Sequence, residues 1–140
     1  MIVLRRVLHA DEVVLARQIR AEVFINEMGR MPHMEWEHEE EATVYMAYMN
    51  TIPIGTARYL ISSEGIELQR FAILPAYRRQ GAGSLLLQHL LNEVKDLGKP
   101  IFLHTYMQTI GFYAKANFVC NGNPYIYPDD GIAYVRMVKL

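Results

Sequence analysis

Arg78-Arg79-Gln80-Gly81-Ala82-Gly83-Ser84 stands directly before the strongest helical repeat of the chain. Two glycines separated by one residue, placed where a helix begins, let the backbone pass close to a ligand. The amides of a first helical turn have no partner within the helix, and the helix dipole favours negative charge at that end. With Arg78 and Arg79 as added mobile cations, this heptapeptide is typical of a pyrophosphate site. The glycine pair by itself fits an ordinary surface loop before a helix equally well.

Two other phosphate motifs do not fit the heptapeptide. A dinucleotide fingerprint requires a third glycine three residues after Gly83, and that position holds Leu86. A P-loop requires a glycine followed by a lysine and then a serine or threonine, and the chain has no such lysine here. The phosphate group therefore belongs to a cofactor of another kind.

The residues before the heptapeptide read as a strand with a fault in its alternation. Ile66 and Leu68 share one parity, whereas Phe71 and Ile73 share the other. An unbroken, half-buried strand keeps its parity because successive side chains point to opposite faces. We therefore expect a β-bulge or a sharp bend at Gln69-Arg70.

Hydrophobic periodicity and turn residues predict the remaining elements. The strongest helical period covers 81–97 and ends at Gly98 and Pro100. Strands are expected at 2–8, 43–49, 54–61, 66–74, 101–106 and 132–138, and helices from Asp11 as N-cap to Gly29, over 81–97 and over 109–116. The order mixes antiparallel hairpins with at least one βαβ crossover. We therefore expect a single domain over residues 1–140 with an α+β fold, a mixed α/β sandwich.

Composition and charge limit the classes of protein to which the chain can belong. Apolar residues make up 51% and charged residues 21% of 140 residues, which excludes disordered, collagenous and coiled-coil classes. The apolar runs are far shorter than the roughly 20 residues of a spanning helix, so no membrane association is expected. The first residues have the wrong order of charge and apolar stretch for a secretory signal, and the single Cys120 cannot form an internal disulfide, so we expect a cytoplasmic protein. Cys120 is expected to be a buried structural thiol. The net charge of −1 predicts no nucleic-acid partner.

The heptapeptide and a second segment together resemble the GNAT family of N-acetyltransferases. Arg78–Gly83 matches that family's Gln/Arg-x-x-Gly-x-Gly/Ala pattern between a bent strand and a long helix. The segment 111–118 resembles the family's Phe-Tyr-x-x-x-Gly-Phe segment, with Asn117 in place of the usual glycine; asparagine is the next best residue at a left-handed helix cap. The similarity runs over nearly the whole chain and extends to the small bacterial branch typified by ElaA and YjcF. This chain has Tyr106 where members of that branch commonly have glutamine, and Tyr134 where they commonly have histidine. Both differences concern the acceptor pocket.

The resemblance implies the GNAT acyl-CoA acyltransferase fold, with a central mixed sheet splayed at its middle strands and helices on both faces. It also implies that acetyl-coenzyme A (acetyl-CoA) lies between the splayed strands. Its pantetheine is expected to meet the backbone of Phe71, Ala72 and Ile73, and its pyrophosphate to lie on Arg78–Ser84. The parity fault gives an independent reason for the first of these strands to diverge from its neighbour.

Two catalytic roles follow from the same resemblance. Tyr113 is expected to protonate or hydrogen-bond the departing thiolate, because a phenol keeps its proton at neutral pH yet can share it with a basic sulfur. Glu67, on the bent strand, is the expected general base. His104 and a water-mediated route are the other candidates for the base. Aromatic packing for Tyr113, surface exposure for Glu67 and a core hydrogen bond for His104 are the structural alternatives.

The acceptor side is predicted from an acidic run ahead of the first hairpin. The run contains Glu35, Glu37, Glu39, Glu40 and Glu41. These carboxylates either draw in a cationic amine or form a solvated surface. Trp36, Tyr125 and Tyr127 are expected to line the acceptor entrance or to pack against loops. His33 and His38 match no closed zinc spacing, so no metal is expected.

With the resemblance, these residues predict an acetyl-CoA-dependent N-acetyltransferase that acts by direct attack in a ternary complex. The acceptor is expected to be a primary amine of a small molecule or a peptide, and a homodimer is an open alternative to a monomer. One other function is a non-catalytic coenzyme A-binding sensor or regulatory module. Another is acylation of charged transfer RNA or of a protein terminus, against which the near-neutral charge and the acidic run argue in the case of RNA.

Overall fold

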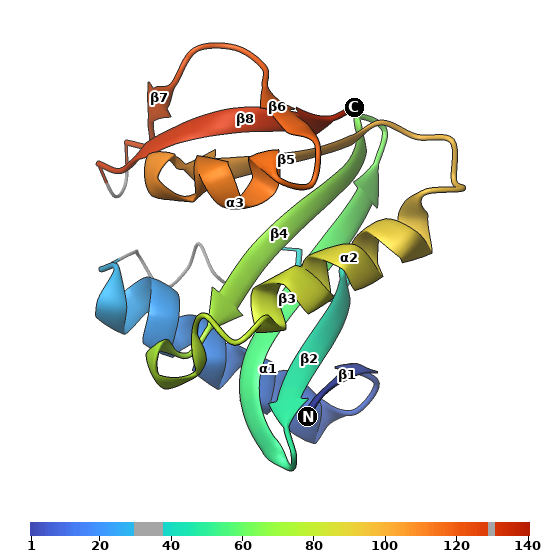
Figure 1. Cartoon of the computed structure of the whole chain (residues 1–140), viewed down its shortest axis with the longest axis vertical. Helices are drawn as coiled ribbons and strands as arrows, with labels where there is room; N and C mark the ends of the chain where they lie inside the picture. The colour runs from blue at the N-terminus through green and yellow to red at the C-terminus, as the bar shows by residue number, and fades with distance from the viewer. Residues whose placement is uncertain (30–37, 129–130) are drawn as a thin grey trace.

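The structure is a computed structural model that describes residues 1–29, 38–128 and 131–140. Within these ranges the chain forms one sheet with helices on both of its faces (Figure 1). The strands are β1 (Ile2–Arg6), β2 (Thr43–Met49), β3 (Ile52–Ser62), β4 (Gly65–Ile73), β5 (Ile101–Tyr106), β6 (Phe118–Cys120), β7 (Tyr125–Ile126) and β8 (Ala133–Lys139). The helices are α1 (Ala10–Arg20), the π-helix η1 (Ala21–Glu27), the short 3-10 helices η3 (Pro75–Tyr77) and η4 (Met107–Thr109), α2 (Ala82–Val94) and α3 (Ile110–Ala114).

The sheet combines antiparallel pairs with one parallel pair. The strand order is β1-β2-β3-β4-β5-β8-β6, and β7 pairs with β8. β4 and β5 run parallel and are joined through α2, because parallel neighbours need a crossover connection. The other pairs in the described part of the chain are antiparallel. The expected α+β architecture with a mixed sheet is confirmed.

β4 and β5 pair only briefly before they diverge. Their register joins residues 66–68 to residues 101–103. Beyond this point β4 continues beside β3 to Ile73, whereas β5 continues beside β8 to Tyr106. The expected splay of the middle strands is therefore present, and Figure 1 shows β4 running diagonally away from β5 and β8.

A β-bulge lies where the parity of β4 changes. Arg58 pairs with Gln69 and Thr56 pairs with Ala72, so one residue of β3 opposes two residues of β4. Arg70, inside the bulge, takes a left-handed backbone conformation with φ 56°. The extra residue brings the apolar side chains on both sides of the bulge to the same core, which confirms the prediction made from the alternation.

Two apolar clusters hold the helices on opposite faces of the sheet. α2 and α3 belong to the larger cluster, in which Leu86 and Leu90 are fully buried. α1 and η1 pack on the other face through Ile19 and Phe24, with Ala72 of β4. Each buried leucine of α2 contributes about 1.5–3 kcal/mol relative to an exposed one. This packing holds the start of α2, and with it the heptapeptide, against the end of β4.

Three local expectations need correction. The first helix begins at Ala10 with His9 as its N-cap, so Asp11 lies in the first turn, where its charge complements the helix dipole. β6 and β7 were not predicted, because strands of three and two residues are too short to show a period. Cys120 is exposed rather than buried, because β6 is an edge strand.

Part of the acidic run lies outside the described residues. The predicted positions that fall there are Glu35 and Glu37 of the run, together with His33 and Trp36. Among the helices that the structure describes, none is both long and apolar enough to cross a membrane.

Candidate active site

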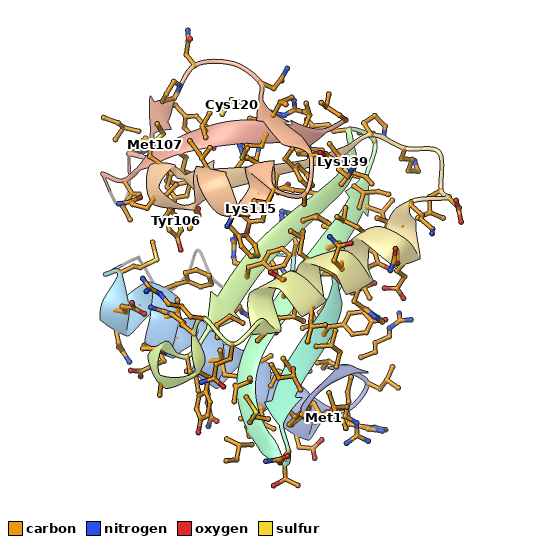
Figure 2. The ribbon with its side chains drawn as sticks, in the orientation of Figure 1. Met1, Tyr106, Met107, Lys115, Cys120 and Lys139 are labelled. Atoms are coloured by element: carbon orange, nitrogen blue, oxygen red, sulfur yellow. The ribbon has the colours of Figure 1, made fainter. Side chains whose placement is uncertain are left out.

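A cavity of about 1090 Å³ opens where β4 and β5 diverge. Residues of β4, η3 and α2 line one side, residues of β5, α3, β7 and β8 line the other, and η1 contributes at its end. In Figure 1 these elements form two groups, α1, α2 and β1–β4 below and α3 and β5–β8 above. Tyr106 and Lys115, which line the cavity, lie on the side of the upper group that faces the lower one (Figure 2). The strand splay thus creates the cavity.

Most of the residues predicted for the site meet in this cavity. Those that line it are Glu67, Phe71, Ile73, Arg78, Arg79, Gly81, Ala82, Gly83, Ser84 and Tyr113. Ala72 instead packs in the cluster with α1, and its side chain is 2% exposed. Gln80 is exposed in the loop before α2 and is not among the lining residues. The strand, the heptapeptide and α3 therefore converge on one cavity.

The heptapeptide forms a tight turn into α2. Gly81 is the N-cap with φ 92°, a left-handed conformation that favours glycine, and its carbonyl accepts a hydrogen bond from the Leu85 N–H at 3.0 Å. A Cβ on Gly83 would lie 3.3 Å from Cζ of Phe112, so glycine allows α2 and α3 to approach closely. The amides of the first turn have no partners within the helix and can bind an anion.

Arg78 is held in place and is not the mobile cation expected from the sequence. Its Nε–H donates to the Ile73 carbonyl at 2.9 Å, and its two terminal nitrogens donate to the Glu27 carboxylate at 2.7 and 2.6 Å. These hydrogen bonds lower the pKa of Glu27 and raise the pKa of Arg78. Arg78 thereby ties η1 to the end of β4. Arg79 is exposed, and no carboxylate of the described residues pairs with it.

The backbone of β4 beyond the bulge directs polar groups into the cavity. The Leu74 N–H donates to the Ile54 carbonyl at 2.9 Å, so the backbone groups of every second residue, including Ala72, face β3. The backbone groups of Phe71 and Ile73 consequently face the side from which β5 has diverged. The Ile73 carbonyl accepts the hydrogen bond from Arg78, and the other outward backbone groups of Phe71 and Ile73 can pair with an extended ligand in the way that a strand would.

Tyr113 projects from α3 into the cavity near the junction of the strands. Its side chain is 7% exposed, and its ring packs edge-on against Phe71, Phe112 and Phe118 with centroid distances of 5.8, 4.9 and 6.1 Å. Burial raises the pKa of the Tyr113 phenol, so the hydroxyl keeps its proton throughout the neutral range. No described residue hydrogen-bonds to this hydroxyl, which leaves it available to a ligand.

Glu67 and His104 lie near one another on the face of the sheet opposite to Tyr113. The parallel register places Glu67 beside Phe102, so alternation puts both residues and His104 on one face. Nδ1 of His104 lies 2.7 Å from the Tyr125 hydroxyl. Burial lowers the pKa of His104, and the nearby Glu67 partly opposes this shift. A carboxylate and a neutral imidazole thus face the cavity, and either can accept a proton.

Four tyrosines form the cavity wall beyond His104. Tyr134 lies at their centre, with centroid distances of 6.2 Å to Tyr106, 6.1 Å to Tyr125 and 6.1 Å to Tyr127. Tyr125 and Tyr127, expected at the acceptor entrance, do line the cavity. Tyr106 and Tyr134 join them because these two residues pair between β5 and β8. The rings give this side of the cavity an apolar, aromatic wall with polar hydroxyl tips.

Several lining residues carried no sequence signal for a site. Phe24 and Met28 come from the end of the first helical segment, where their period indicates only a core. Lys115 comes from the end of α3. In the part of the chain that the structure describes, no group of three His, Cys, Asp or Glu side chains could hold a metal ion.

The described part of the acidic run makes ion pairs within the protein. Glu39 pairs with Arg17 and with the buried Arg20 of α1. Glu41 lies 3.1 Å from Nδ1 of His38. The charge of Glu39 therefore stabilises the contact with α1 and is not presented to a substrate.

Comparison with known proteins places the chain among acetyltransferases. A family model described as an acetyltransferase (GNAT) domain matches residues 9–140. A Bacillus subtilis (strain 168) protein, named provisionally as an acetyltransferase, is 32% identical over 142 residues, which cover 96% of this chain and 94% of the relative. The crystal structure of Escherichia coli ElaA matches with a TM-score of 0.88 at 20% identity and covers 100% of both chains. An acyl-CoA N-acyltransferase from Pseudomonas aeruginosa, also covering 100% of both chains, matches with a TM-score of 0.83 at 19% identity. At these identities the two structural matches show the fold.

Proposed function

The chain belongs to the GNAT acetyltransferase family, and we propose that it transfers an acetyl group from acetyl-CoA to a primary amine by direct attack in a ternary complex. Membership of the family supports acyl-CoA-dependent N-acyltransferase activity. The acetyl group, the amine acceptor and the roles of individual residues are the proposal. The observation that carries it is the cavity at the strand splay, where an anion-binding turn, a protonated phenol and two proton acceptors meet.

The cavity fits an acyl-CoA in its size and in its donors. Its volume of about 1090 Å³ suits a long cofactor, since pockets for drug-sized ligands measure about 300–1,000 Å³. The pyrophosphate would lie on Arg78–Ser84, where a Cβ at Gly81 would meet no atom within 4 Å and Arg79 adds an exposed cation. The pantetheine would run along Phe71–Ile73, where the backbone groups of Phe71 and the N–H of Ile73 face outward and can pair with its amides. When bound, this co-substrate supplies the activated acyl group as a thioester.

Tyr113 would act as the general acid. The amine nitrogen attacks the thioester carbonyl carbon, and the carbon–sulfur bond then breaks with its electron pair on sulfur. A phenol whose pKa is raised by burial still carries its proton at that moment, so it can donate to the developing thiolate. The absence of a hydrogen bond to this hydroxyl from the described residues supports this role, because the donor is not occupied elsewhere.

Glu67 would act as the general base, with His104 beside it. An ammonium ion has no lone pair, so the acceptor must lose a proton before it attacks. Glu67 faces the tyrosine-lined side of the cavity, and it can take that proton directly or through a water. His104, which burial keeps neutral, is the alternative acceptor of the same proton.

The remaining parts of the proposal concern the setting of the reaction. We assign all 140 residues to one catalytic domain that works without a metal. The acceptor would be a small molecule or a peptide rather than a nucleic acid, and the reaction would take place in the cytoplasm, with the chain alone or as a homodimer.

The test is an acceptor screen with acetyl-CoA. The protein is incubated with acetyl-CoA and separate amines, comprising amino sugars, polyamines, arylalkylamines and peptides. Thiol release is measured against a sample without amine, and mass spectrometry identifies the acetylated product. Acceptor-dependent release supports the proposal. Calorimetric coenzyme A binding without turnover on any amine supports the sensor function, and absence of coenzyme A binding contradicts both.

A further inference from the structure

A second cavity, of about 520 Å³, gathers every lysine of the chain. The sequence contains four lysines, Lys95, Lys99, Lys115 and Lys139, and all four line this cavity, which we call the lysine groove. They come from the C-terminal end of α2, the turn before β5, the end of α3 and the end of β8. In Figure 2 Lys115 and Lys139 lie on the upper elements that border the C-terminal half of α2. Residues far apart in the sequence therefore concentrate positive charge in one place.

The side chains that line the lysine groove supply four ammonium groups and no carboxylate. No aspartate or glutamate is among its lining residues. Glu93 of α2 lies outside it and accepts a hydrogen bond from the Tyr45 hydroxyl at 2.8 Å. Asp96, next to Lys95 in sequence, does not line it. Since the whole chain has a net charge of −1, the groove is a local feature and not the consequence of a basic protein.

The helix dipole explains only part of the cluster. Cations stabilise the C-terminal end of a helix, so Lys95, the C-cap of α2, and Lys115, the C-cap of α3, have a structural role there. Lys99 lies between α2 and β5 and Lys139 ends β8, so neither caps a helix. No Asp or Glu side chain of the described residues pairs with any of the four, and Lys139 Nζ donates to a main-chain oxygen of Leu140 at 3.1 Å.

We propose that the lysine groove binds a small molecule with several phosphate groups. This site lies outside the cavity between β4 and β5, which we call the acyl-CoA cavity. Ammonium groups are compact charges that suit multiply charged phosphates. Three amide side chains, those of Gln88, Asn92 and Asn117, line the same space and can hydrogen-bond the uncharged part of such a ligand. The volume of about 520 Å³ lies within the range of small-molecule sites.

Lys115 connects the groove to the acyl-CoA cavity, because it lines both. A polyphosphate in the groove and the phosphates of coenzyme A therefore share one cation. Each ligand should weaken the other about two- to five-fold without excluding it, and linkage makes this effect equal in both directions. The phosphate groups of coenzyme A itself could also occupy the lysine groove, so the test is made with the acyl-CoA cavity saturated with coenzyme A.

Inorganic tripolyphosphate is the probe, titrated by calorimetry into the full chain saturated with coenzyme A at low ionic strength. The wild-type chain should bind it, and added salt should weaken the binding steeply. The double variant Lys95→Gln/Lys99→Gln leaves the acyl-CoA cavity unchanged. It should bind tripolyphosphate at least about ten-fold more weakly than the wild-type chain. Arg5→Gln/Arg6→Gln removes the same charge from β1, at the other end of the sheet, and should change the affinity less than about two-fold.

Three results would overturn the proposal. They are no binding to the coenzyme A-saturated wild-type chain, undiminished binding to the lysine double variant, and an equal loss in the arginine double variant. Thermal melting checks that each variant is folded, and Lys99→Gln/Lys139→Gln provides a second lysine pair if the first does not fold. If the chain binds no coenzyme A, that result contradicts the proposed function alone. Tripolyphosphate binding and its dependence on the lysines are then measured in the absence of coenzyme A.

Discussion

Replacement of Tyr113 by phenylalanine separates a catalytic phenol from a packing residue. The variant keeps the ring, whose edge-on contacts to Phe71, Phe112 and Phe118 have centroid distances of 5.8, 4.9 and 6.1 Å. It removes only the hydroxyl, which makes no hydrogen bond to the described residues. We therefore expect the free energy of unfolding to change by less than about 1 kcal/mol, since no internal hydrogen bond is lost.

The expected effect on turnover is much larger. If the hydroxyl donates to the leaving thiolate, its removal should lower kcat about 100- to 10,000-fold, the range for loss of one general acid. The affinity for coenzyme A should stay within about two-fold, because in the proposed binding mode its phosphates and pantetheine would contact other elements. The assay is thiol release from acetyl-CoA with the amine found in the acceptor screen, together with calorimetry of coenzyme A binding.

Tyr59→Phe is the matched control. Tyr59 is 8% exposed, belongs to the same apolar cluster and does not line the acyl-CoA cavity, so its hydroxyl should have no effect on kcat. An unchanged kcat in Tyr113→Phe, with coenzyme A still bound, would refute the assignment of Tyr113 as the acid. Equal losses in both variants would show that the effect comes from the core and not from proton transfer.

Three further substitutions test the site and its supports. Glu27→Gln breaks a pair whose side chains are 38% and 41% exposed, so denaturant unfolding should show a loss of no more than about 1 kcal/mol at neutral pH. Because the folded pKa of Glu27 lies below 4.5, the difference from wild type should vanish as pH falls through that lowered value, and a constant difference would contradict the pairing. Gly65→Ala places a Cβ 2.4 Å from the Pro100 carbonyl oxygen at φ 134°, so the midpoint of denaturation should report a loss of about 2–3 kcal/mol; Gly122→Ala, with open space and φ 103°, is the milder control, and equal losses would argue against the clash. The folded pKa of His104 lies below 6.5, so the unfolded chain binds this proton more tightly and the free energy of unfolding decreases as the pH is lowered through that range. His104→Gln should therefore reduce the drop in Tm between about pH 7.5 and pH 5. An unchanged drop would show that His104 is not its source.

Some of the site was predictable because its signals are local. The parity fault at Gln69-Arg70 lies within one strand, and the structure has the bulge there. The glycines of the heptapeptide indicate a tight turn before the helix, and Gly81 is the left-handed N-cap of α2. Tyr113 was recognised from the segment around it, and the fold brings it to the cavity.

Other features depend on partners that no local pattern reveals. Arg78 reads as a free cation beside the phosphate turn, but it is bound by Glu27, which lies 51 residues earlier in the chain. Tyr106 and Tyr134 meet only because β8 pairs with β5. Each of these contacts requires the register of strands or the docking of a helix, which a single sequence does not contain.

The amino-acid order alone determined the periods, turns and caps, since hydrophobic alternation and backbone preference act over a few neighbouring residues. It was therefore enough to indicate a bent strand, a glycine-rich turn and a long leucine helix. Only the tertiary structure decided where β4 and β5 separate, which side chains face the resulting cavity and that all four lysines share one groove. The physical reason is that these arrangements arise from long-range strand pairing and from helices packed on both faces of the sheet, whose free energy no local segment contains.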